Sequence, residues 1–133
     1  MSVQQMVAWF NLSVATVSAA AYLVLSTLIG PWRAMGAFGL LGFAGFSVLF
    51  YRKSKVAGRI SADERDALIG IKAFAAAKSV IWVALIVAFL IALRVFGDHG
   101  AVPIQLIALV LWLSVCAFLI IQSIATLILY TRQ

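Results

Sequence analysis

The segment SADERDALIGIKAFAAAKSVIWVALIVAFLIALRVF, residues 61–96, decides the fold of this chain. It begins with charged side chains and ends in an apolar run that includes Val80 and Leu93. Ser61 and Glu64 match the S-x-x-E capping box that starts helices. One helix from Ser61 to Phe96 is about 50 Å long at 1.5 Å per residue, whereas the hydrocarbon layer of a bilayer is about 30 Å thick. We therefore predict a membrane-crossing helix over residues 73–96 with an extension into the cytoplasm over residues 61–72.

The composition places the rest of the chain in the membrane as well. Of the 133 residues, 65% are hydrophobic and only 11% are charged, whereas soluble domains carry about 25% charged residues. Each membrane span needs about 20 apolar residues, so four spans with short connections use the whole chain. We predict an all-α integral membrane protein, a four-helix transmembrane bundle that forms a single domain over residues 1–133. The expected spans are residues 6–29, 34–51, 73–96 and 102–130.

The densest positive charge lies between the second and third spans. Loop 52–60 holds Arg52, Lys53, Lys55 and Arg59. Because Lys and Arg concentrate in cytoplasmic loops, this cluster predicts a cytoplasmic loop with both termini on the same side. We expect a multi-pass protein of the cell membrane, the inner membrane of a bacterium. The formal charge of +6 is then a topology feature and predicts no nucleic-acid partner. The four cations are also expected to bind anionic lipid headgroups, at about 1 kcal/mol each.

Small residues predict where the helices pack. Gly36, Gly39, Gly42 and Gly45 recur at every third position, and on an α-helix such a ridge winds around the axis. It suits close contact with more than one neighbouring helix, or close approach to a flat cofactor as the lesser alternative. In the third helix, small residues cluster within about 60° on a helical wheel above an acid, and we predict that they form its packing face. They are Gly70, Ala73, Ala77, Ala84 and Ala88, with Asp66 at the foot.

Few polar side chains fall within the predicted spans. Lys78 lies about one turn inside the membrane boundary and either extends to the cytoplasmic surface or lines a polar site. Asn11 and Gln122 lie at broadly similar depth, and a hydrogen bond between them would satisfy two costly polar groups. Such interhelical bonds contribute about 0.6 kcal/mol on average. We consider Lys78, Asn11 and Gln122 as an intramembrane polar site.

Asp63-Glu64-Arg65-Asp66, followed by Ile69, Lys72 and Ala73, resembles a family of small multi-pass membrane proteins of unknown function. The mark of that family is an Asp-Glu-Arg-Asp segment, an aliphatic residue and Lys-Ala, leading into a transmembrane helix. The match covers about a dozen residues and the multi-span layout. The resemblance implies an integral membrane protein and assigns no activity. It raises a docking or partner-binding role for Asp63, Glu64, Arg65, Asp66 and Lys72, beside the structural one in which they cap the helix and form ion pairs along it.

The sequence predicts a protein that is not an enzyme and that carries no metal and no cofactor. Its single histidine, His99, falls in the turn between the last two spans, so two-histidine haem ligation within one chain is excluded. Its single cysteine, Cys116, lies in an apolar run. We expect an interaction, regulatory or accessory membrane subunit that works through its charged cytoplasmic helix segment. The expected partners are membrane lipids and either further copies of the chain or another membrane protein. The alternative is a small oligomeric transporter or channel for a small solute or lipid, which would need a continuous polar cavity.

Overall fold

The computed structural model describes residues 2–50, 52, 64–97 and 100–132. Four helices in these ranges are long and apolar enough to cross a membrane: Val3–Ile29, Pro31–Phe50, Glu64–Phe96 and Ile104–Thr131. The prediction of an all-α bundle of four membrane-length helices is confirmed. The third helix is described from Glu64 onwards, and Ser61, the predicted start of its capping box, lies outside the described residues.

The helix ends follow from local chemistry. Helix α1, Val3–Ile29, starts with a capping box in which Ser2 and Gln5 exchange hydrogen bonds of 2.9 and 3.2 Å between side chain and backbone. It ends at Gly30, whose φ of 90° favours glycine, and Pro31 opens the short helix α2, Pro31–Ala34. Helix α4, Glu64–Phe96, is followed by Gly97 with a φ of 68°. The expected helix break at Gly30-Pro31 is thus confirmed.

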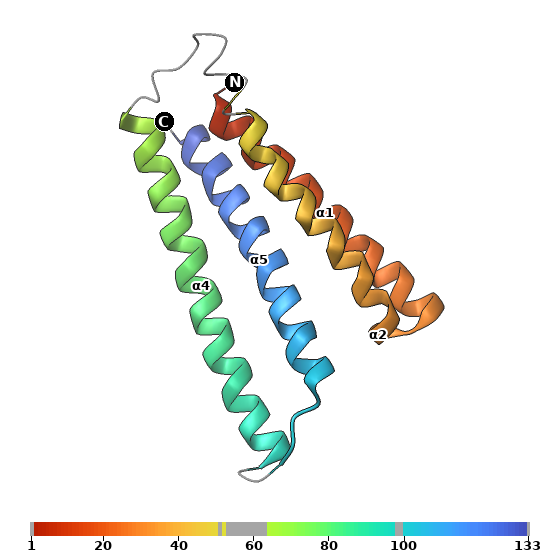
Figure 1. The fold of residues 1–133 in the computed structure, drawn as a ribbon. Helices are drawn as coiled ribbons and strands as arrows, with labels where there is room; N and C mark the ends of the chain where they lie inside the picture. Colours follow the sequence, from red (N-terminus) through yellow and green to blue (C-terminus); the bar gives the residue numbers. More distant parts are fainter. Residues whose placement is uncertain (1, 51, 53–63, 98–99, 133) are drawn as a thin grey trace.

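Helix α5, Ile104–Thr131, lies at the centre of the bundle (Figure 1). It packs against α1 on one side and α4 on the other, so α4 forms an edge of the molecule. Both chain ends lie at one end of the bundle, together with the start of α4 (Figure 1). We call this the termini end, and we call the opposite end, which contains Gly30 and Gly97, the turn end.

The second span is a 3₁₀-helix over most of its length. Element η1, Met35–Ser47, continues α2 and packs against α1. A 3₁₀-helix has 3.0 residues per turn, so residues three apart stack in straight columns. The column facing the bundle is buried or half-buried throughout, whereas the glycine column is exposed throughout. The first contains Met35, Phe38, Leu41, Ala44 and Ser47, and the second contains Gly36, Gly39, Gly42 and Gly45.

This geometry corrects the predicted glycine ridge. The ridge does not wind around the helix, because the period of the sequence matches the 3.0-residue turn of η1 and not the 3.6-residue turn of an α-helix. A Cβ atom added at any of the four glycines would meet no other residue within 4 Å. The glycines therefore form a straight, open strip on the outside of the chain, and they do not mediate helix packing within one copy.

The core lies where α1, η1 and α5 meet. Ala15, Phe38, Leu41 and Cys116 form its buried cluster. The Phe38 ring is fully buried and stacks between Tyr22 and Trp112, with ring centroids 4.8 and 6.2 Å away. Close backbone approach is visible in the hydrogen bond of 3.0 Å that the buried Ser18 hydroxyl donates to the Ala37 carbonyl across the α1–η1 contact.

The packing face of α4 includes the predicted small residues except Ala84. Ala73 and Ala77 are fully buried and Gly70 and Ala88 are half-buried, but Ala84 is exposed. Beyond Ala77 the half-buried positions also include four that were not predicted, namely Ile81, Leu85, Ala92 and Phe96. These positions recur on average at slightly more than 3.6 residues, so the contact with α5 drifts around α4. The prediction for Ala84 is wrong because the helical wheel assumed a contact running parallel to the helix axis.

Replacing Ala73 or Ala77 by Leu should force α4 away from α5, because neither position leaves room for a larger side chain. Overpacking of this kind costs about 1–3 kcal/mol, so both variants should unfold at lower temperature in detergent. Ala84→Leu is the matched control, since position 84 is exposed and the variant should unfold like the wild type. Equal unfolding temperatures for all three variants would contradict this packing face.

Candidate functional site at the termini end

A polar contact joins three helices at the termini end. The Tyr130 hydroxyl, on the last turn of α5, donates a hydrogen bond of 2.5 Å to Oδ1 of Asp66 on the first turn of α4. The same hydroxyl lies 3.5 Å from Oε1 of Gln4 on the first turn of α1. A Cβ atom added at Gly70 would lie 3.4 Å from Nε2 of Gln4, so the Gln4 side chain extends from α1 to the surface of α4 here. We call Gln4, Asp66 and Tyr130 the polar junction.

The structure separates the predicted docking residues into two groups. Asp66 is half-buried and bonded within the bundle, whereas Glu64, Arg65 and Lys72 are exposed. Glu64 and Asp66 lie in the first turn of α4, where their charge is favoured by the helix dipole, as the sequence indicates. Asp63 lies outside the described residues. Asp66 is therefore engaged in a hydrogen bond within the bundle, whereas Glu64, Arg65 and Lys72 lie on the surface.

Gln4 and Tyr130 were not predicted as site residues. Tyr is common at membrane interfaces for reasons of packing and hydration, so Tyr130 at the end of the last span does not stand out. Its partner Asp66 is 64 residues away in the sequence. The antiparallel arrangement of α4 and α5 could have indicated this contact. In an antiparallel hairpin, the last turn of α5 lies beside the first turn of α4, which carries the acids.

Of the predicted lipid-binding cations, the structure describes Arg52, which is exposed. Lys53, Lys55 and Arg59 lie outside the described residues. Because Arg52 ends the second span on the side opposite Gly30, it belongs to the termini end of the bundle. The described part of the predicted headgroup site and the polar junction thus share one end of the molecule.

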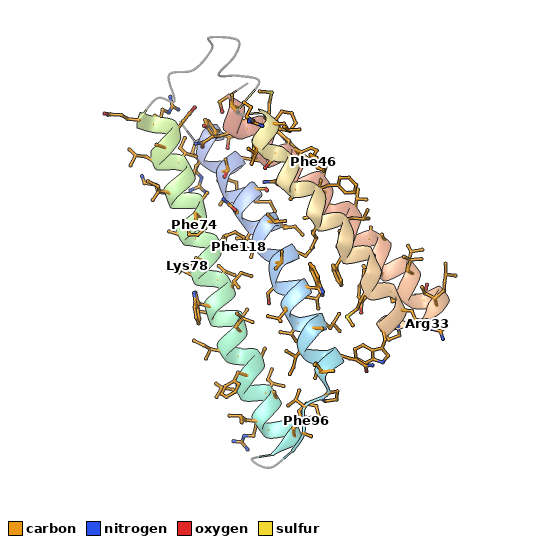
Figure 2. The ribbon with its side chains drawn as sticks, viewed as in Figure 1. Arg33, Phe46, Phe74, Lys78, Phe96 and Phe118 are labelled. Carbon is orange, nitrogen blue, oxygen red and sulfur yellow. The ribbon has the colours of Figure 1, made fainter. Side chains whose placement is uncertain are left out.

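The predicted intramembrane polar residues do not come together. Lys78 lies on α4, one turn beyond Phe74, and its side chain is exposed (Figure 2). The predicted hydrogen bond between Asn11 and Gln122 is not formed: Oδ1 of Asn11 is buried and has no hydrogen-bond partner in the part of the chain that the structure describes. Asn11 lies on the face of α1 that also carries the buried residues Ala8, Ala15 and Ser18. It is therefore directed into the bundle at an energetic cost.

A cavity of about 450 Å³ separates α4 from α5 near the turn end. The helices touch nearer the termini end, where the rings of Phe74 and Phe118 meet edge to face with centroids 5.5 Å apart (Figure 2). The side chains lining the cavity are apolar, and they include Leu85, Phe89, Phe96, Leu106 and Val110. The cavity therefore offers space for a hydrocarbon group and no side-chain hydrogen bond.

Within the described ranges, no group of three or more His, Cys, Asp or Glu side chains is arranged to hold a metal ion. Comparison of the chain with family models, with curated proteins and with solved structures found no match. The function must therefore be argued from the geometry of the chain itself.

Asn11→Leu should stabilise the protein, because it replaces a side chain whose buried Oδ1 atom has no hydrogen-bond partner among the described residues by an apolar side chain of similar size. Leaving a buried polar group unsatisfied costs about 1–3 kcal/mol, and a gain of that order should raise the unfolding temperature in detergent. Asn11→Asp should lower it, because a charge is costlier to bury than an amide. A lower unfolding temperature for Asn11→Leu would show that the Asn11 side chain is satisfied in the folded protein.

Proposed function

We propose that this chain is an interaction, regulatory or accessory subunit of the cell membrane that catalyses no reaction and binds a membrane-protein partner or further copies of itself. The contact is made through the charged start of α4. The observation that carries the proposal is the arrangement of α4 at the edge of the bundle. One side of its first turns is held by the polar junction. The other side carries the exposed charges of Glu64, Arg65 and Lys72.

The exposed charges are not needed to stabilise the bundle. Exposed ion pairs contribute only about 0–1 kcal/mol, and Glu64, Arg65 and Lys72 are all exposed. The 33 residues of α4 correspond to about 50 Å of helix, which is longer than the hydrocarbon layer of about 30 Å. The first turns of α4 can therefore extend beyond the hydrocarbon and present these charges at the membrane surface.

The orientation that we propose places the termini end in the cytoplasm of a bacterial inner membrane. It is supported by the positive-inside rule, because Arg52, Lys53, Lys55 and Arg59 lie in the sequence between the second span and α4. The same four cations would bind anionic lipid headgroups. Arg33 and Arg94, near the turn end, are the minority of the positive charge.

The glycine strip of η1 supports association within the membrane. Glycines let two helix backbones approach closely where lipid offers no hydrophobic force between helices. Gly36, Gly39, Gly42 and Gly45 are exposed and leave the space beyond them open. A helix of a second copy or of another membrane protein would fit such a surface better than it would fit a strip of large side chains.

A small oligomeric transporter or channel for a small solute or lipid is the alternative function. A transport path needs polar groups along a continuous cavity, whereas the cavity between α4 and α5 has an apolar lining. Lys78 is exposed on α4 and would have to meet such a path between copies of the chain. Solute transport in liposomes that Lys78→Met abolishes, with the fold retained, would favour this alternative.

Removing the exposed charges should abolish association without unfolding the bundle. In pull-downs from native membrane, the double variant Glu64→Ala and Lys72→Ala should lose a partner chain or an oligomer that the wild type retains, and its unfolding temperature should stay unchanged. Asp66→Ala is the contrasting variant, because it breaks the polar junction and should lower the unfolding temperature. Retained association in the double variant would contradict docking through this segment.

The orientation is tested by placing single cysteines at Ser54 and at Ala101, which is exposed at the turn end. In intact cells, a membrane-impermeant thiol reagent should label position 101 and spare position 54, because the basic loop is expected in the cytoplasm. After the cells are lysed, position 54 should react as well, which shows that its thiol is accessible. Labelling of position 54 from outside intact cells would contradict the orientation.

A further inference from the structure

We infer that the Tyr130 hydroxyl acts as a latch: it holds the first turns of α4 against the bundle and so fixes the direction in which the charged segment of α4 points. The inference rests on the proposed function for its consequence, the presentation of a docking segment. The latch itself concerns only the position of α4 relative to α1 and α5, so it can be tested in the absence of any partner.

The first turn of α4 buries no apolar side chain. The buried residues of α4 begin one turn later, at Ile69, whereas Ala67 and Leu68 are exposed. Burial stabilises a contact roughly in proportion to the apolar area removed from water or exchanged for close packing, and the first turn gains none from its own side chains. Polar contacts consequently carry a larger share of the attachment in this turn than further along the helix, where Phe74 meets Phe118.

The hydrogen bond from Tyr130 is well placed to provide that attachment. It joins the first turn of α4 to the last turn of α5, at 2.5 Å from Asp66. A hydrogen bond to a charged acceptor is shorter and stronger than one between neutral groups. Gln4, 3.5 Å from the same hydroxyl, brings the start of α1 to the same point. The Tyr130 hydroxyl of α5 therefore contacts the first turn of α4 and the first turn of α1 at the termini end of the bundle.

The consequence concerns the exposed charges. Glu64 and Arg65 immediately precede Asp66, and Lys72 follows within two turns. If Asp66 is held by Tyr130, these side chains keep a fixed position relative to α1 and α5. If the bond is lost, the first turns of α4 separate from the bundle and the charged surface changes shape. Tyr130 is thus a positioning residue for the docking segment.

The experiment measures distances between spin labels in detergent-solubilised protein. One pair of labels joins Leu68 on the first turns of α4 to Ser13 on α1, and the second joins Val95 to Leu28 near the turn end; all four positions are exposed. In Tyr130→Phe, the distribution for the first pair should gain a longer component, because the ring remains and only the hydroxyl is removed. The distribution for the second pair should stay as in the wild type.

Tyr22→Phe is the matched control, since Tyr22 stacks on Phe38 in the core and its hydroxyl forms no hydrogen bond among the described residues. It should leave both distributions unchanged. Asp66→Asn keeps the shape of the acceptor and removes its charge, so it should give a weaker form of the Tyr130→Phe effect. The buried Cys116 is replaced by Ala in every sample, to restrict labelling to the chosen positions.

A Tyr130→Phe distribution identical to that of the wild type at the termini end would overturn the latch, as would equal lengthening at both ends. The docking proposal is assessed separately, by pull-down of the Glu64→Ala and Lys72→Ala double variant. If that variant retains association while the distances lengthen in Tyr130→Phe, docking through this segment is contradicted and the latch is supported. If it loses association while the Tyr130→Phe distances stay unchanged, the latch is overturned and docking is supported.

Discussion

The structure depends on how closely its helices can approach. Lipid is as apolar as the side chains of Leu and Ile, so association of helices in a membrane gains little from hydrophobic burial and relies on van der Waals contact and interhelical hydrogen bonds. The buried positions of this chain reflect that constraint. Most are small, namely Ala8, Ala15, Ser18, Ala34, Ala37, Ala73, Ala77, Cys116 and Ser123, and the large hydrophobic side chains are mostly exposed. Among the described residues, the large buried hydrophobic side chains are Phe38, Leu41 and Ile69, and the ring of Phe38 fills the space between α1, η1 and α5.

The number and approximate bounds of the helices could be predicted from the sequence, because both depend on local properties. Apolar runs of membrane length, the break at Gly30-Pro31 and the acids at the start of α4 are each visible within a few residues. The 3₁₀ geometry of η1 was also encoded locally, in the period of three that its glycines share with Met35, Phe38 and Leu41. The prediction of a winding glycine ridge was wrong because such a ridge follows only from the 3.6 residues per turn of an α-helix.

Contacts between helices were harder to predict because they depend on tilt and register. Ala84 lies on the same side of a helical wheel as Ala73 and Ala77, yet it is exposed because the contact drifts around α4. Similar depth suggested a bond between Asn11 and Gln122, but depth does not determine which way a side chain points. The junction of Asp66 with Tyr130 and Gln4 joins residues from three helices, and no sequence pattern links them.

Most of the hydroxyl groups described below form hydrogen bonds within their own helix, and few form hydrogen bonds between helices. Ser13, Ser79, Ser114 and Thr126 each donate to the carbonyl four residues earlier in their own helix, so they are satisfied locally and connect nothing. Among the described residues, two hydroxyls cross between helices instead: Ser18 to Ala37 between α1 and η1, and Tyr130 to Asp66 between α5 and α4. The first is buried in the core and accompanies extensive packing. The second reaches the first turn of α4, which buries no apolar side chain and carries the exposed charges. A polar link is most consequential where no apolar contact accompanies it, so the junction at Tyr130 is the point at which a small chemical change would alter the surface that this protein offers to a partner.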